Sequence, residues 1–412
     1  MNLNSNVYFV KGFKNAAVYD LNTRQVYAIN EVGKKILEKY LKNDETSMNE
    51  DEKEFIDKLV ALNILTQNKK DKINLVKPNT HLIYTWLELT DRCNMNCVHC
   101  YGEFGKPSTS KNEMLSTTEW KQIIDELIQL GCLDIQLIGG EPTVHKDFFD
   151  ILKYAHDKGM KRIDVFTNAT LINENNISVF KENNCNVRVS VYGHNSEIHD
   201  KITQYKGSFE KTKNALCLLK KHNIPTKIAV VIMKENEKYV EDIKKFIHSI
   251  GHEYTGYDVI RPSCANTISS HTISDVEVLR SRYNVKPIFR TSKEEFFSNY
   301  YFNSCWNGKL AITAKGDVIP CIFARDEVVG NVRKNSIDEI KKGIIEKWSI
   351  TKDKIDVCKD CEFRYCCHDC RPISKGINGD VLSKYPRCCY DPYAGVWRNI
   401  EDITREVNGG KL

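Results

Sequence analysis

Residues 84–101 read YTWLELTDRCNMNCVHCY, a strand-like apolar run followed at once by three cysteines. Cys93, Cys97 and Cys100 have the spacing C-x3-C-x2-C and come just after the strand predicted at residues 84–89. Three thiolates can hold three irons of a cubane iron–sulfur cluster, which leaves the fourth iron open to a small molecule. The alternatives are structural cysteines or a zinc site, although zinc sites usually have four ligands in C-x2-C pairs.

The surrounding residues, 81–262, alternate predicted strands and helices. After residues 84–89, strands are predicted at residues 133–138, 162–166, 187–192, 228–233 and 257–260. The first helix between them begins at Ser116 and Glu119, which have the spacing of a capping box. Six β/α repeats predict an α/β fold with a parallel sheet, open or partly closed as a TIM-like (β/α)6 barrel. In such folds the site lies at the C-terminal ends of the strands, where the cysteines are.

A glycine-containing turn, Gly139-Gly140-Glu141-Pro142, directly follows the second predicted strand. Together with the cysteines, this turn resembles the radical S-adenosylmethionine (SAM) superfamily, whose signature is C-x3-C-x-Φ-C with Φ usually aromatic. His99 stands at that position here. The resemblance implies that the cysteine triplet holds a cluster that cleaves SAM. The implied SAM contacts are Gly139, Gly140, Glu141, Pro142, Asn168 and Ser190.

One further family motif is incomplete. The family often has His-Asp-x-x-Arg after the fourth strand, with the arginine as a carboxylate partner. The chain reads His199-Asp200-Lys201-Ile202-Thr203, so Thr203 stands in place of the arginine and that contact is not assigned.

The C-terminal cysteines resemble the SPASM extension of radical peptide- and protein-modifying enzymes. Gly316 lies between the first two of these cysteines, and the last spacing inside the C-x2-C block is one residue short of the family pattern. The resemblance implies two auxiliary 4Fe–4S clusters, against the alternative of a zinc knot. Expected ligands of the first are Cys305, Cys321 and Cys370, and of the second Cys358, Cys361, Cys367 and Cys388, with Cys389 as the alternative to Cys388. Ala311 stands where some relatives have a fourth ligand of the first cluster, so Cys264 replaces it or one iron is open.

Residues 1–75 show a hairpin followed by two helical patterns, the first of which Asn30 can cap. This order resembles the winged-helix-like recognition element of ribosomal-peptide maturases, which binds a leader peptide as an added strand. A DNA-binding winged helix and a purely structural cap are the alternatives. Acidic residues gather at positions 44–54, which disfavours DNA binding.

The composition narrows the function classes further. The net charge of +5 is spread along the 412 residues without a block of like charges, so nucleic-acid binding has little support. No apolar run approaches the roughly 18 residues of a membrane span, and the start does not have the pattern of a secretory signal. Sixteen cysteines without an export signal indicate metal ligands in a cytoplasmic protein rather than disulfides.

These observations predict three domains: a peptide recognition domain at 1–75, a radical SAM barrel at 76–290 and a SPASM domain at 291–412. The expected cofactors are three 4Fe–4S clusters and S-adenosyl-L-methionine. The expected partners are a precursor peptide with a leader and a low-potential donor such as flavodoxin or ferredoxin. The favoured product is a thioether of the sactipeptide or ranthipeptide type, formed when a peptide cysteine on the open iron couples to a carbon radical. Carbon–carbon or carbon–oxygen crosslinking, epimerisation and sulfatase-type oxidation remain alternatives, as does an iron–sulfur electron carrier or redox regulator.

Overall fold

The computed structural model describes residues 2–42, 47–66, 77–78, 80–102, 104, 114–261, 270–274, 278 and 289–399. The chain divides into two compact units. Unit 1 comprises Met1–Asn79, Asp275–Asn307 and Trp348–Leu412, and unit 2 comprises Thr80–Ser274 and Gly308–Lys347. The predicted boundary at residues 75–76 and the predicted ligand Cys264 lie outside the described residues, and the division into three domains stays a prediction.

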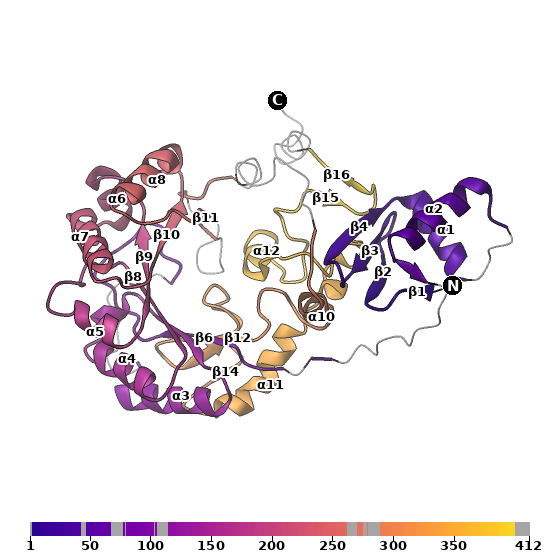
Figure 1. The fold of residues 1–412 in the computed structure, drawn as a ribbon. Coiled ribbons are helices and arrows are strands. Elements are labelled where there is room, and N and C mark those ends of the chain that lie inside the picture. The colour runs from indigo at the N-terminus through magenta and orange to yellow at the C-terminus, as the bar shows by residue number, and fades with distance from the viewer. Residues whose placement is uncertain are drawn as a thin grey trace. The chain divides into compact units, whose positions relative to one another are not determined.

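Unit 2 is built on one nine-stranded sheet, drawn with its helices in Figure 1. Its strands are β6 Tyr84–Glu88, β7 Asp134–Ile138, β8 Arg162–Thr167, β9 Asn186–Val191, β10 Thr226–Ile232, β11 Tyr257–Val259, β12 Lys309–Ile312, β13 Asp317–Ile319 and β14 Gly330–Asn331. Strands β6 to β11 are parallel neighbours in chain order, as the β/α alternation predicted. Beyond β6 the sheet continues with β12, which is parallel to β6, and with the antiparallel β13 and β14. The fold is therefore α/β with a mostly parallel sheet.

The connecting helices of unit 2 pack apolar faces against this sheet. They are α3 Thr117–Gln129, α4 Phe148–Asp157, α5 Ile177–Glu182, α6 Ser196–Thr203, α7 Ser208–Lys221 and α8 Val240–Ser249, and α11 Ile337–Trp348 follows β14. The capping box predicted for α3 is present, because Ser116 accepts from the Glu119 N–H and Glu119 accepts from the Ser116 N–H. Helix α6 was not predicted, and it contributes directly to the site described below.

Unit 1 contains the N-terminal strands. Strands β2 Val7–Lys11, β3 Ala16–Asp20 and β4 Gln25–Ile29 form an antiparallel sheet in the order β2-β3-β4, and β1 Asn2–Leu3 pairs with β5 Leu65–Thr66. Helices α1 Glu31–Leu41 and α2 Glu50–Ala61 follow, and Asn30 caps α1 as predicted. The winged-helix type of this segment stays a prediction.

Every residue of β3 is buried, because both faces of the N-terminal sheet are covered. Ala16 and Val18 pack with α1 and α2, whereas Ala17 and Tyr19 belong to a second apolar cluster on the other face. The second cluster includes Phe296 of α10 Lys293–Tyr301 and residues from the C-terminal cysteine region. The N-terminal sheet and that region therefore share one core.

The remainder of unit 1 carries most of the C-terminal cysteines on short elements. These are the 3-10 turns η3 Lys352–Lys354 and η4 Cys358–Asp360, helix α12 Arg371–Asn378 and the hairpin of β15 Tyr390–Asp391 with β16 Val396–Trp397. Throughout the described residues, the helices are too short or too polar to cross a membrane.

Candidate functional site

The C-terminal ends of strands β6 to β9 surround one pocket in unit 2. Residues predicted for the site that line it are Cys93, Cys97, Cys100, Gly139, Gly140, Glu141, Asn168 and Ser190. Pro142 begins the short 3-10 helix Pro142–Val144 and is not among the lining residues. The parallel sheet explains this convergence, since residues that follow neighbouring parallel strands meet at one edge. The structure thus brings together eight of the nine residues expected around the first cluster and SAM.

Helix α6 holds the cysteine loop in place. The Asn96 N–H donates to the Thr203 carbonyl at 3.2 Å, and the Val98 N–H donates to the Ile202 carbonyl at 3.0 Å. The Thr203 side chain is fully buried and lies 2.7 Å from the Ser208 hydroxyl. The residue at the family's arginine position therefore supports the loop through its carbonyl and does not line the pocket.

The two glycines of the turn are required by the loop that precedes the cysteines. The Gly140 N–H donates to the Thr90 carbonyl at 2.8 Å, and the Glu141 N–H donates to the Arg92 carbonyl at 2.9 Å. A Cβ atom at Gly139 would lie 2.5 Å from the Thr90 oxygen, and one at Gly140 would lie 2.2 Å from the Arg92 oxygen. Any larger residue would force the turn away from the loop. The sequence argument assigned this close approach to a ligand, whereas the structure shows it toward the protein's own backbone.

Glu141 ties the turn to the next strand. Its carboxylate accepts hydrogen bonds from the N–H and hydroxyl of Thr143, from the Thr167 hydroxyl at 2.6 Å and from the Asn168 N–H at 2.7 Å. The side chain is buried, and burial raises its pKa although these donors oppose the shift. Its carboxylate is thus a structural acceptor at the pocket wall.

Asn168 links the end of β8 to the cysteine loop. Its amide donates to the Asn94 side chain at 2.8 Å and accepts from the Thr170 hydroxyl at 2.7 Å, while Asn94 donates to Thr170 at 2.9 Å. This closed ring of three polar side chains fixes the loop between Cys93 and Cys97. Asn168 therefore positions the predicted cluster ligands in addition to lining the pocket.

His99 faces Tyr192 edge-on, with ring centroids 4.6 Å apart. Its Nδ1 atom is buried and has no hydrogen-bond partner within the part of the chain that the structure describes. Burial lowers the pKa of His99 to about 4, so the imidazole is neutral near pH 7. It supplies a flat, uncharged ring at the position that is usually aromatic in the family.

The donor set of the pocket fits an iron–sulfur cluster. Burial raises the pKa of Cys93 to about 11 and that of Cys97 further, so both thiols are protonated when no metal is bound. Cluster binding would displace those protons. Among the residues that the structure describes, no three His, Cys, Asp or Glu side chains surround a point closely enough for a single metal ion.

A buried ion pair beside the pocket was not predicted from the sequence. The Arg325 guanidinium contacts the Glu88 carboxylate at 2.7 Å, and the Tyr101 hydroxyl lies 3.4 Å from the same oxygen. Glu88 ends β6 and Arg325 follows β13, 237 positions away. No local sequence pattern predicts such a pair, because the residues around Glu88 and around Arg325 do not indicate that the two side chains are in contact.

The second group of cysteines lies within unit 1. Apart from burial, the pKa of Cys361 is raised by the nearby charges of Cys367 and Cys388, and that of Cys358 by Cys388. The pKa of Cys367 is raised in turn by the charge of Cys358. These four side chains are therefore close enough to interact, in line with the predicted second auxiliary cluster.

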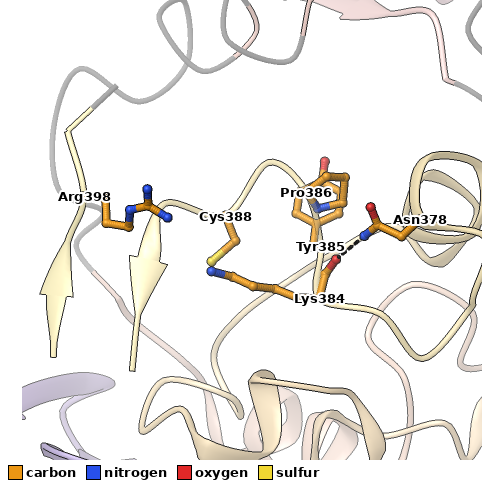
Figure 2. Close-up of a pocket in the computed structure, with 6 residues that line it drawn as sticks. All are labelled: Asn378, Lys384, Tyr385, Pro386, Cys388 and Arg398. Carbon is orange, nitrogen blue, oxygen red and sulfur yellow. Dashed lines mark hydrogen bonds between the residues drawn. The ribbon is translucent and has the colours of Figure 1, made fainter. Parts of the chain in front are cut away.

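Cys388 and Cys389 have different surroundings. Cys388 interacts with Cys367, whereas the pKa of Cys389 responds to no cysteine of the group other than Cys388. Cys388 also borders a pocket with Lys384 and Arg398, and Figure 2 shows Lys384 extending toward its sulfur. These contacts favour Cys388 over Cys389 as the ligand.

The first auxiliary cluster is less defined. The Cys305 N–H donates to the Asn303 side chain at 2.8 Å, and Cys370 directly precedes α12. Both belong to unit 1, whereas Cys321 belongs to unit 2. The assignment of these three cysteines to one cluster stays a prediction.

Comparison with known proteins agrees with this geometry. Residues 87–247 match the model of the radical SAM superfamily, and residues 305–362 match an iron–sulfur cluster-binding domain called SPASM. The Fe-coproporphyrin III synthase of Methanosarcina barkeri is 36% identical over 79% of this chain and 90% of that protein. The chain belongs to the radical SAM superfamily.

Another relative of this radical SAM protein is named for bacteriocin biosynthesis. The antilisterial bacteriocin subtilosin biosynthesis protein AlbA of Bacillus subtilis is 27% identical over 75% of the chain and 71% of its own length. Among solved structures, SuiB of Streptococcus suis bound to S-adenosylmethionine has a TM-score of 0.57 and 14% identity, over 90% of this chain and 96% of SuiB. A second SuiB structure contains its precursor peptide SuiA.

Proposed function

We propose that this radical SAM enzyme modifies a ribosomally synthesised precursor peptide and forms a thioether between a cysteine and a carbon of another residue. The observation that carries the proposal is the pocket where three cysteines meet the turn, Asn168 and Ser190 at the strand ends. A SPASM match and the similarity to AlbA, named for bacteriocin biosynthesis, and to a PqqA peptide cyclase support the substrate class. The N-terminal segment is the proposed leader-binding element.

The predicted residues that line the pocket each have a task in this proposal. Cys93, Cys97 and Cys100 hold the first cluster, which when bound supplies the electron that cleaves SAM. Gly139 and Gly140 offer backbone carbonyl groups to SAM, and Asn168, Ser190 and Tyr192 line the same pocket. Glu141 and the α6 carbonyls hold these residues in position, while the buried pocket wall shields the reacting atoms from water. The electron comes from a low-potential protein such as flavodoxin or ferredoxin.

The thioether part of the proposal rests on the predicted ligand set of the first auxiliary cluster. Ala311 is fully buried on β12 and pairs with Ile319 of β13, two residues before Cys321. A methyl side chain cannot ligate iron, and the predicted cluster ligands from this region are three. The thiolate of a substrate cysteine is the proposed fourth ligand, which would hold that sulfur for coupling.

A second candidate function is chemistry on an iron tetrapyrrole. It is favoured by the 36% identity to the Fe-coproporphyrin III synthase, which exceeds the 27% identity to AlbA. The thioether proposal and this candidate differ in the substrate consumed, and one experiment can separate them.

The test is incubation of the anaerobically reconstituted enzyme with SAM, a strong reductant and a cysteine-containing peptide encoded beside its gene. We expect 5′-deoxyadenosine, a peptide lighter by two hydrogens, and one thiol that resists alkylation. A lighter peptide with every thiol alkylatable would indicate another crosslink, and deuterium uptake from heavy water would indicate epimerisation. Turnover of an iron tetrapyrrole with an unmodified peptide would favour the second candidate. Absence of 5′-deoxyadenosine at full cluster loading would contradict the radical mechanism.

The thioether step has its own test in Ala311→Cys. Restoring a fourth protein ligand would exclude the substrate thiolate, so we expect thioether formation to fall at least tenfold while iron content is retained. Ala311→Ser is the matched control, since its side chain is similar in size but does not ligate iron as a thiolate does. Unchanged thioether formation by Ala311→Cys, with normal cluster content, would contradict the open-ligand proposal.

A further inference from the structure

We propose that a buried ion group, Lys352, Asp369 and Arg371, supplies net positive charge beside the second auxiliary cluster and sets its reduction potential. The inference rests on the proposed function and on the predicted ligands of that cluster, Cys358, Cys361, Cys367 and Cys388. It assigns a role to three residues that the cysteine pattern leaves unexplained.

The three charged side chains form one closed contact group. Lys352 and Arg371 both pair with Oδ2 of Asp369, and the exposed side-chain fractions are 5% for Lys352 and 0% for the other two. Arg371 is fixed further, because its Nη1 donates to the carbonyl oxygens of Val381 at 2.7 Å and Ser383 at 2.9 Å. Two cations share one carboxylate, so the group carries one net positive charge out of contact with water.

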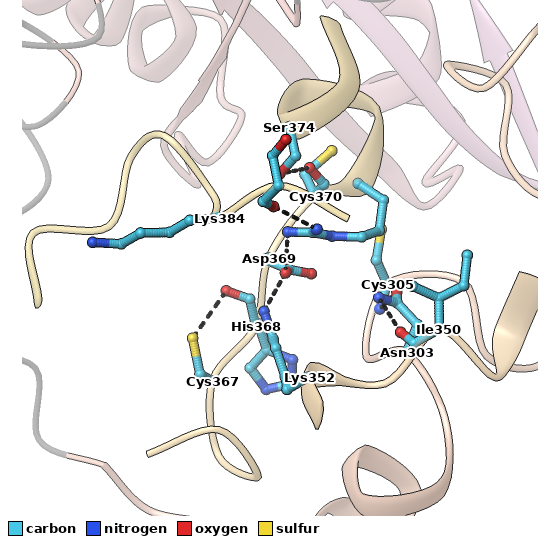
Figure 3. Close-up of polar contacts among 12 residues, drawn as sticks. Asn303, Cys305, Ile350, Lys352, Cys367, His368, Asp369, Cys370, Ser374 and Lys384 are labelled. Carbon is cyan, nitrogen blue, oxygen red and sulfur yellow. Dashed lines mark hydrogen bonds and ion pairs between the residues drawn. The ribbon is translucent and has the colours of Figure 1, made fainter. Parts of the chain in front are cut away.

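The group lies among the predicted cluster ligands. Asp369 is placed in the segment from Cys367 to Cys370, and Figure 3 shows Lys352 reaching toward it from a separate segment. Asp369 lies two residues after Cys367, and both cations pair with its carboxylate. The charge is therefore held next to Cys367, one of the four proposed ligands.

Stability alone does not account for such an arrangement. Removing ions from water costs several kcal/mol each, and a buried ion pair often recovers no more than this cost. A second cation on the same carboxylate adds that cost again without a second anion. Asp369 Oδ1 and Arg371 Nε are also buried without a hydrogen-bond partner among the residues that the structure describes. The second cation and the unpartnered Arg371 Nε donor would both be stabilised by a nearby anion, which the described residues do not supply.

A cluster ligated by four thiolates is such an anion. The thiolates outweigh the positive charge of the irons, and reduction by one electron adds another negative charge without breaking a bond. A fixed positive charge stabilises the reduced form more than the oxidised form, so it raises the reduction potential. The Asp369 carboxylate raises the pKa of Lys352 against the effect of burial, so Lys352 carries a positive charge at neutral pH.

The test is a redox titration of the reconstituted full-length enzyme, followed by electron paramagnetic resonance. The relevant signal is the one that Cys367→Ala removes, and iron content is measured for each variant. Lys352→Met should make reduction of this cluster at least tenfold less favourable, which is about 59 mV for one electron. Asp369→Asn should shift the potential in the opposite direction, because it removes the negative charge and leaves both cations.

Two controls separate charge from structure. Lys352→Arg keeps the charge and should keep the potential near that of the wild type. Lys359→Met removes an exposed lysine next to Cys358, whose charge is screened by water, and should shift the potential less than Lys352→Met. Potentials that do not move, or that move in the same direction for Lys352→Met and Asp369→Asn, would overturn the inference. If wild-type enzyme has no signal that depends on Cys367, the ligand assignment of the proposed function fails as well.

Discussion

Individual residues of the pocket act on one another as much as on a ligand. Asn168 and Glu141 were predicted as SAM contacts, and both are engaged in hydrogen bonds that fix the cysteine loop and the turn. The Glu141 carboxylate accepts from two residues on β8 or its end, Thr167 and Asn168. A change at Glu141 should therefore disturb the pocket before any ligand enters.

We predict that Glu141→Gln lowers the free energy of unfolding by about 1–3 kcal/mol, because an amide nitrogen replaces one buried acceptor oxygen. Urea denaturation monitored by circular dichroism measures this loss, and SAM affinity should fall with it. The control is Glu197→Gln. Glu197 is exposed in the first turn of α6, so this change should alter the free energy of unfolding by at most about 0.5 kcal/mol. Equal stability of Glu141→Gln and wild type would show that the carboxylate is not a structural acceptor.

The sequence predicted which residues gather at the pocket, but it did not predict the hydrogen bonds and ion pairs that hold them there. Cys93, Gly139 and Asn168 converge as expected because each follows a strand of the same parallel sheet. The Glu88–Arg325 pair was not predicted, because its members are far apart in the sequence. Tertiary packing alone brings the two side chains together. Residue types therefore indicated the chemistry, while the supporting contacts required the fold.

At the scale of elements, local signals predicted well where they were complete. Helix α3 has a capping box and a regular apolar face, and it begins where predicted. Helix α2 begins at Glu50, five residues before its first large apolar residue, Phe55, because Asn49 caps a polar first turn. Helix α6 spans eight residues, which is too short for a clear periodic signal, although Asn195 caps it.

The start of α3 should give a pH-dependent stability. Arg333 hydrogen-bonds to Glu119 at 2.6 Å and, with Ser116, lowers the pKa of that carboxyl to about 2. A carboxyl whose pKa is lower in the folded state stabilises the protein above its unfolded pKa, and this contribution is lost as the pH falls toward 2. We predict that Arg333→Gln costs about 0.5–1 kcal/mol at pH 7, a value that allows for solvent screening of a partly exposed pair.

The measurement is urea unfolding of metal-free protein at pH 7 and pH 3. The difference between Arg333→Gln and wild type should shrink at pH 3, where more of the unfolded carboxyl is protonated. Lys121→Gln is the control on the same helix, because Lys121 pairs with Asp150 rather than with the capping residues. A difference that stays constant or grows on acidification would contradict the assigned role of Glu119.

At the scale of the whole molecule, the N-terminal sheet is built into the compact unit that carries Cys358, Cys361, Cys367 and Cys388. The Tyr19 hydroxyl donates to the Glu362 carbonyl at 2.8 Å and also lies 3.5 Å from the Cys366 sulfur. The Phe13 N–H donates to the Asp360 carbonyl at 2.7 Å. The sequence did not indicate these contacts, because a pattern of strands and helices does not reveal what covers the second face of a sheet.

Deletion of residues 1–79 should therefore do more than remove the proposed leader-binding segment. It would uncover Phe296, Phe363 and Tyr365, and each large apolar side chain exposed costs about 1.5–3 kcal/mol. Since a domain has a total stability of about 5–15 kcal/mol, we predict that the second auxiliary cluster is lost and that residues 348–399 become sensitive to protease. Iron bound at Cys93, Cys97 and Cys100 in unit 2 should remain, which iron content and electron paramagnetic resonance would measure.

The control is Val32→Ala. The Val32 side chain on α1 is 65% exposed, so this change should leave the first cluster and the second auxiliary cluster intact. A deletion variant that keeps the Cys367-dependent signal would instead show that the N-terminal segment is a detachable module, and leader binding could then be studied apart from the clusters.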